Sequence, residues 1–129
     1  MINFVIGIGS NIDGKRGVIE QALAKLDTFF SRVMASAIYD TKALNGVDAD
    51  YCNCVAVYCA NNYSAAQIVE LLKLVEIQFG RNSQQKSMGL VSLDLDLVIY
   101  DGVVLRHRDY NYDYFQIGWT ELQKSLSVL

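Results

Sequence analysis

The chain has 129 residues, of which 52% are hydrophobic and 19% are charged, and its formal net charge is −3 at pH 7. This length and composition predict a single domain over residues 1–129, long enough to bury its own core. The slightly acidic balance, without a long run of Lys and Arg, argues against nucleic acid as a partner. No apolar stretch reaches the length of a membrane span and the first residues lack a basic leader, so we expect a cytoplasmic protein with no membrane partner.

The chain contains three cysteines, Cys52, Cys54 and Cys59. Their odd number, with neither a CxxC spacing nor a nearby His, supports neither a disulfide framework nor a zinc site. We therefore expect buried free thiols. The sequence leaves the oligomeric state open.

The first half of the chain alternates strand-like and helix-like segments. Residues 2–8 are apolar and β-branched, and the turn-forming residues 9–11 follow them, which predicts a first strand. Apolar residues at spacings of three and four predict a helix over residues 15–30. Residues 33–40 and 52–60 are predicted to form two further strands, joined by a polar loop.

The second half continues the alternation. A capping box followed by helical periodicity predicts a helix over residues 64–80. A polar loop, 81–89, leads into a strand at 91–100. Beyond it the sequence predicts a short strand at 103–105 and a helix at 117–127.

The order of these elements, β-α-β-β-α-β, is typical of a ferredoxin-like α+β fold. In that fold an antiparallel sheet carries both helices on one face and leaves the other face open. The segment after residue 105 is a C-terminal extension whose position the pattern does not define.

Two acidic residues interrupt the apolar strand VSLDLDLVIY. Alternation places the side chains of Asp94 and Asp96 on one face of this strand, roughly 7 Å apart, and the neighbouring leucines on the other. Strands are depleted in Asp, and like charges on one face repel. A solvated sheet face is one interpretation. The other is a magnesium site, in which carboxylates, water and substrate phosphate share the coordination.

Two segments are similar to known motifs, but neither similarity supports a function. Residues 9–16, GSNIDGKR, match GxxxxGK, but Arg16 stands where a P-loop has Ser or Thr, and the predicted sheet is not parallel. Residues 107–111, HRDYN, are similar to a kinase catalytic loop with the wrong spacing, in a chain too short for that fold.

Five dispersed segments carry a family resemblance, in the right order over residues 2 to about 105. The opening FVIGIGSNIDGKRGVIEQALAKL is similar to the LGSNLGDR opening of the 6-hydroxymethyl-7,8-dihydropterin pyrophosphokinases of folate biosynthesis. Residues IYDT, DYCN and VEIQFGR resemble that family's VYET, DFLN and IExxLGR. The most specific match is SLDLDLVIY, which resembles TLDLDLLLY.

The resemblance implies a ferredoxin-like fold and transfer of the terminal pyrophosphate of ATP to the hydroxymethyl group of the pterin, with release of AMP. It implies small molecules as partners, ATP as co-substrate and two Mg²⁺ ions held by Asp94 and Asp96. The residues that it assigns to the pterin are Asn53, the backbone of Thr41 to Leu44, and Tyr51, while Arg81 would meet the phosphates.

The chain departs from the family pattern in two places. Ser83, Ser87 and Val91 stand where the family has arginines, and Lys86 is the nearest replacement cation, although it lacks the bidentate fork of Arg. The C-terminal family segment is not recognisable. There we expect a cation from His107 or Arg108 and a stacking ring from Phe115 or Tyr114, although the alternating run RDYNYDYF also fits an exposed strand with one aromatic face.

Two hypotheses of different class follow. One is a magnesium-dependent pyrophosphokinase, weakened by the lost arginines, because each charge-assisted phosphate contact is worth roughly 1.5–3 kcal/mol. The other is a catalytically impaired protein that binds a pterin or a nucleotide, or serves as an interaction domain. A different metal-dependent phosphoryl transfer on the same scaffold is a weaker alternative.

Overall fold

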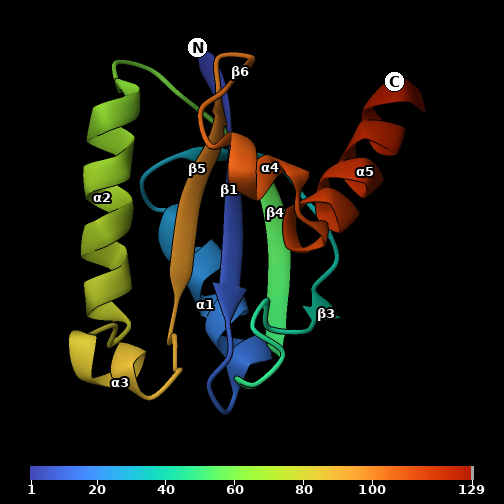
Figure 1. The fold of residues 1–129 in the computed structure, drawn as a ribbon. Coiled ribbons are helices and arrows are strands. Elements are labelled where there is room, and N and C mark those ends of the chain that lie inside the picture. Colours follow the sequence, from blue (N-terminus) through green and yellow to red (C-terminus); the bar gives the residue numbers. More distant parts are fainter. Residues whose placement is uncertain (129) are drawn as a thin grey trace.

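The structure, a computed structural model that describes residues 1–128, is a six-stranded antiparallel sheet with helices on both faces (Figure 1). Leu129, the last residue of the predicted domain, lies outside the described residues. The strands are β1 (Ile2–Ser10), β2 (Ser31–Ala35), β3 (Tyr39–Thr41), β4 (Tyr51–Ala60), β5 (Asp94–Tyr100) and β6 (Val103–Val104). The helices are α1 (Lys15–Leu26), α2 (Ala65–Gln78), α3 (Ser83–Ser87), α4 (His107–Asn111) and α5 (Asp113–Val128).

The order of the strands confirms the predicted ferredoxin-like α+β fold. The sheet runs β2-β4-β1-β5-β6, and β3 pairs with β4 beyond the end of β2. The long strands β1 and β4 therefore form the centre, where β1 pairs with β4 over residues 2–10 and with β5 on its other side. This placement brings the strand with the two acids beside the first strand of the chain.

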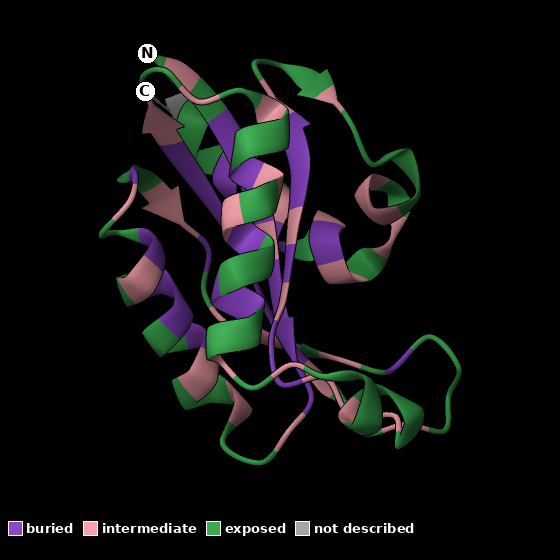
Figure 2. Cartoon of the chain, turned by 90° about the vertical axis from the view of Figure 1, so that its left-hand side faces the viewer, coloured by how far each residue is buried: buried purple, intermediate pink, exposed green. Residues whose placement is uncertain are grey.

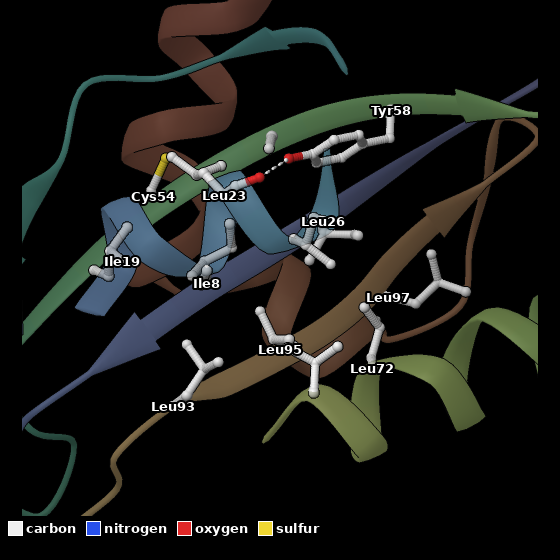
Figure 3. Close-up of a cluster of buried hydrophobic side chains, with 14 of the residues drawn as sticks. Ile8, Ile19, Leu23, Leu26, Cys54, Tyr58, Leu72, Leu93, Leu95 and Leu97 are labelled. Atoms are coloured by element: carbon white, nitrogen blue, oxygen red, sulfur yellow. Dashed lines mark hydrogen bonds between the residues drawn. The ribbon is translucent and has the colours of Figure 1, made fainter. Parts of the chain in front are cut away.

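Helices α1 and α2 cover one face of the sheet and enclose the larger core (Figure 3). Leu95 and Leu97 of β5 and Leu93 just before it lie in this core, as the alternation of the segment predicts. Helix α2 begins with the predicted capping box, in which Ser64 Oγ accepts from the backbone N–H of Gln67 at 3.1 Å and the Gln67 side chain accepts from that of Ser64 at 2.8 Å. In Figure 2 the outward surface of α2 is exposed and the strands behind it are buried.

The other face of the sheet is not open, so this part of the fold expectation is wrong. Helices α4 and α5 lie against it, in front of the sheet in Figure 1, and a second core forms around Phe115 and Leu122 of α5 with valines of β1, β4 and β5. Gly118 lets α5 approach closely, because a Cβ there would lie 2.7 Å from Val55 Cγ2. The hydroxyl of Tyr39 in β3 donates to the carbonyl of Tyr114 at 2.6 Å and ties the two elements together.

The segment predicted as one strand over residues 33–40 is two strands, because Ser36 takes over the pairing. Its N–H donates to the carbonyl of Val55 at 2.8 Å, and its hydroxyl accepts from the N–H of Val55 at 3.0 Å. The next N–H, of Ala37, donates to the carboxylate of Glu121 in α5 at 3.0 Å. The ladder is interrupted, and β3 resumes at Tyr39.

Several further boundaries differ from the sequence prediction: β5 begins at Asp94 instead of residue 91, and α5 begins at Asp113 instead of residue 117. Helix α1 ends at Leu26 instead of residue 30, and the predicted loop 81–89 contains α3. The run RDYNYDYF is helical, in α4 and the start of α5, so the exposed-strand interpretation is wrong. Tyr110, Phe115 and Trp119 pack on the second core, which the local alternation concealed.

The thiols and the helix lengths complete the description. Cys52 and Cys54 are buried, Cys59 is only partly buried, and all three are free. Among residues 1–128, no helix combines the length and apolar character needed to cross a membrane.

Candidate active site

A pocket of about 330 Å³ lies on the face of the sheet that carries α4 and α5. Its floor is formed by β1, β4 and β5, and its walls by the loop after β3 and by the start of α5. Small-molecule sites commonly have this size. It is lined by eight of the candidate site residues named from the sequence: Thr41, Leu44, Tyr51, Asn53, Asp94, Asp96, Tyr114 and Phe115.

Two glycines of β1 lack side chains that would otherwise fill the pocket. Gly9 pairs with Asp94 and Gly7 pairs with Asp96. A Cβ at Gly9 would lie 3.2 Å from Asn53 Oδ1, which is tighter than an ordinary contact, so a side chain at this position would crowd the pocket. The start of the resembled GSN segment therefore leaves space above the two acids.

The two acids project from β5 into the pocket. The side chain of Asp94 is 35% exposed, whereas that of Asp96 is only 16% exposed. Burial, followed by the charge of Asp94, raises the pKa of Asp96 to about 8. The neighbouring positive charges therefore do not fully compensate the two carboxylates.

A divalent cation would supply the positive charge that the two carboxylates lack. In the described part of the chain, no group of three or more His, Cys, Asp or Glu side chains is arranged to hold a metal ion. Magnesium does not require one, because it is usually held by one or two carboxylates with water and substrate phosphates. Asp94 and Asp96 thus fit magnesium that arrives with a phosphorylated substrate.

Arg81 joins the acids from the end of α2. Its Nη1 lies 2.6 Å from Glu76 Oε2 and 2.9 Å from Asp94 Oδ1. Burial acts to lower the pKa of Arg81, but Asp94 and Glu76 outweigh it and the pKa is raised. Of the family arginine set, Arg81 thus reaches the acid pair.

Glu76 is a site residue that the sequence reasoning missed. Its side chain is largely buried, and burial raises its pKa against the opposing effects of its hydrogen bonds and of Arg81. Besides Arg81 it receives the N–H of Leu95 at 2.7 Å, so it links α2 to the strand between the two acids. The sequence contained a signal for this residue, because Glu76 is the acidic residue of the segment VEIQFGR that resembles the family's IExxLGR.

Asn11, the last residue of the GSN segment, has a structural role. Its Nδ2 donates to the carbonyl of Gly89 at 2.8 Å, and its Oδ1 accepts from the N–H of Val91 at 2.6 Å. The backbone N–H of Asn11 also donates to the carbonyl of Val91 at 3.1 Å. This buried side chain therefore positions the approach to β5 and its acids.

Replacing Asn11 with Ala is expected to lower the free energy of unfolding by about 1–3 kcal/mol, because it removes a buried side chain and leaves the partly buried N–H of Val91 without its acceptor. Urea unfolding measures the loss, and amide exchange should show faster exchange at Val91. Asn61→Ala, at an exposed turn, is the matched control. Equal stability of the two variants would contradict the structural role of Asn11.

The pocket also contains the residues that the resemblance assigns to a pterin, together with Phe115. Asn53 Nδ2 donates to Thr41 Oγ1 at 2.6 Å, which fixes the amide at the pocket wall. Tyr51 is partly buried, and burial is the main reason that its pKa is raised. Phe115 is 1% exposed and closes the pocket from α5, while Leu44 is exposed at its rim.

Some predicted cations are not brought to the pocket. Lys86 is exposed on α3 and is not among the described residues that line the pocket. The same holds for His107 and for Arg108, whose guanidinium lies 5.9 Å from the centre of the Tyr112 ring. The cation of this region that reaches the acids is Arg106, which the sequence reasoning overlooked.

Two further polar groups of the pocket, Asp109 and Tyr114, lie near α5. The hydroxyl of Tyr114 donates to one carboxylate oxygen of Asp109. Burial, followed by this hydrogen bond, raises the pKa of Tyr114, so the phenol stays protonated. Tyr114 is thus held by hydrogen bonds at both its hydroxyl and its carbonyl.

The family model for 7,8-dihydro-6-hydroxymethylpterin-pyrophosphokinase (HPPK) matches residues 5–124. No curated protein matches the sequence.

Proposed function

The chain belongs to the 7,8-dihydro-6-hydroxymethylpterin-pyrophosphokinase family, and we propose that it transfers pyrophosphate from ATP to 6-hydroxymethyl-7,8-dihydropterin in a magnesium-dependent reaction. The family performs this transfer in folate biosynthesis and uses ATP and Mg²⁺. We further propose that the whole chain is one such domain. A cytoplasmic location is supported by the odd number of free thiols.

One observation carries the proposal: one pocket contains both an acid pair suited to magnesium and phosphate, Asp94 and Asp96, and polar and aromatic side chains suited to a flat heterocycle, Asn53, Tyr51 and Phe115. Gly9 lies between the two sets, because it pairs with Asn53 of β4 on one side and with Asp94 of β5 on the other. A ring bound beside Asn53 would therefore lie next to phosphates bound at the acids.

In the proposed reaction, the hydroxymethyl oxygen of the pterin attacks the β-phosphorus of ATP, and AMP leaves with the former bridging oxygen. Asp94 and Asp96 would hold two Mg²⁺ ions, which supply charge neutralisation at the transferring phosphates. Arg81, already oriented by Glu76, would donate to a phosphate oxygen. Asn53 would donate to or accept from the pterin edge, and the pterin ring would pack between Tyr51 and Phe115.

The test is AMP release from ATP and Mg²⁺, measured with and without 6-hydroxymethyl-7,8-dihydropterin, for the wild type and for an Asp94→Asn, Asp96→Asn variant. We expect release that depends on the pterin and is absent from the variant. Release equal to the background of the variant, from folded wild-type protein, would reject the catalytic proposal.

A second candidate function, binding without catalysis, is favoured by the cations that are missing. Ser83, Ser87 and Val91 replace family arginines, and Lys86 on α3 is exposed outside the pocket lining. Such a protein would bind the pterin, measured by its fluorescence, yet release no AMP. Binding and turnover assays on the same preparation separate the two functions.

A further inference from the structure

Each of the two acids in the pocket has its own arginine. Arg81 approaches Asp94 from the α2 side at 2.9 Å. Arg106, which directly precedes α4, approaches Asp96, with its Nη2 3.5 Å from Asp96 Oδ1. The two guanidinium groups therefore contact different acids of the pair and belong to segments 25 residues apart in the chain.

Arg106 is aimed at the acids by its neighbours. It lies between β6 and α4, where its backbone N–H donates to the carbonyl of Val98 in β5 at 3.4 Å. Its Nε donates to the carboxylate of Asp109, which in turn receives the hydroxyl of Tyr114. This chain of contacts links the guanidinium to α5. Figure 1 shows α4, which begins directly after Arg106, in front of the sheet.

The guanidinium of Arg106 has room to change partners. Its side chain is 51% exposed, in contrast to 16% for Asp96. A half-exposed ion pair at 3.5 Å is worth little, because water screens the charges. Arg106 can therefore leave Asp96 at little cost when a stronger ligand for either group arrives.

The charge of the pocket calls for such a cation. Among the described residues that line it, four carboxylates (Asp48, Asp94, Asp96 and Asp109) face one ammonium group (Lys42). This lining repels the triphosphate of ATP unless further positive charge is supplied. Arg106 and Arg81 are close enough to supply it, and a guanidinium matches phosphate oxygens in a bidentate geometry.

We propose that Arg106 is a phosphate-binding residue of this site: it pairs with Asp96 in the metal-free protein and moves to a phosphate oxygen of the nucleotide when Mg²⁺ takes the carboxylate. The inference rests on the proposed function. It makes two opposite predictions for one residue, because Arg106 competes with Mg²⁺ for Asp96 but cooperates with Mg²⁺ in holding the nucleotide.

Isothermal titration calorimetry tests both predictions on the full chain. The ligands are Mg²⁺ alone and, in excess Mg²⁺, the ATP analogue with a methylene group between the α and β phosphates. For Arg106→Ala we expect the analogue to bind about 10- to 100-fold more weakly and Mg²⁺ alone to bind about two- to fivefold more tightly. Arg106→Lys, which keeps the charge without the fork, should lie between the wild type and Arg106→Ala for the analogue.

Arg108→Ala is the matched control, because Arg108 lies two residues after Arg106, in α4, and packs on Tyr112 outside the pocket lining. It should bind both ligands as the wild type does. If the wild type and Arg106→Ala bind the analogue equally, the role of Arg106 is overturned while nucleotide binding stands. If the folded wild type does not bind the analogue, the proposed function fails, and the role of Arg106 fails with it.

Discussion

Asp96→Asn is expected to unfold at a higher temperature than the wild type in magnesium-free buffer at pH 9, by roughly 3–6 °C, and to release AMP at least about a hundredfold more slowly. The stability gain arises because the Asp96 carboxylate is largely buried beside Asp94. Replacing the charge with a neutral amide removes a repulsion that, in the proposed function, magnesium would otherwise relieve. A residue kept for stability alone would show the opposite sign.

The pH dependence follows from the raised pKa of Asp96. This carboxyl titrates at about 8 in the folded protein and near 4 in an unfolded chain. The folded state therefore binds more protons between these values, so this group makes the free energy of unfolding fall as the pH rises from about 4 to about 8. In Asp96→Asn that part of the slope should be absent.

Thermal unfolding between pH 5 and 9, with and without Mg²⁺, measures both effects. Magnesium should stabilise the wild type and leave Asp96→Asn nearly unchanged. Asp101→Asn is the control, since Asp101 is exposed in the turn after β5. The expectation is wrong if Asp96→Asn is less stable than the wild type throughout this range.

Phe115→Ala is expected to lower the free energy of unfolding by about 3–5 kcal/mol, because it opens a cavity in the second core. Phe115 is 1% exposed, and its ring centre lies 5.8 Å from that of Tyr110 and 6.1 Å from that of Trp119. It also closes the pocket, so the variant should bind a pterin more weakly. Urea unfolding and pterin fluorescence measure the two losses.

Two variants separate the packing of Phe115 from its place in the pocket. Phe115→Leu keeps most of the apolar volume but removes the flat ring, so it should retain more stability than Phe115→Ala while losing pterin affinity. Ile117→Ala, at a half-exposed position of α5, should change neither by a large amount. A loss below about 1 kcal/mol for Phe115→Ala would show that α5 does not depend on this contact.

The sequence by itself determined the central sheet and the face on which the acids lie. A strand has a side-chain period of two, so burying Leu93, Leu95 and Leu97 necessarily turns Asp94 and Asp96 to the other face. The same logic of local periodicity placed α1, α2 and the long strands, with errors only at their ends.

The tertiary structure decided what lies opposite those acids. Packing of α4 and α5 on the second face depends on contacts between distant segments, such as Tyr39 with Tyr114 and Ala37 with Glu121, and no local period encodes them. The same is true of Arg106, which reaches Asp96 only because β6 returns alongside β5 as its antiparallel neighbour. Side chains that are far apart in the chain come together only when the helices and strands pack against one another. The partners of a site residue are therefore visible only in the folded molecule.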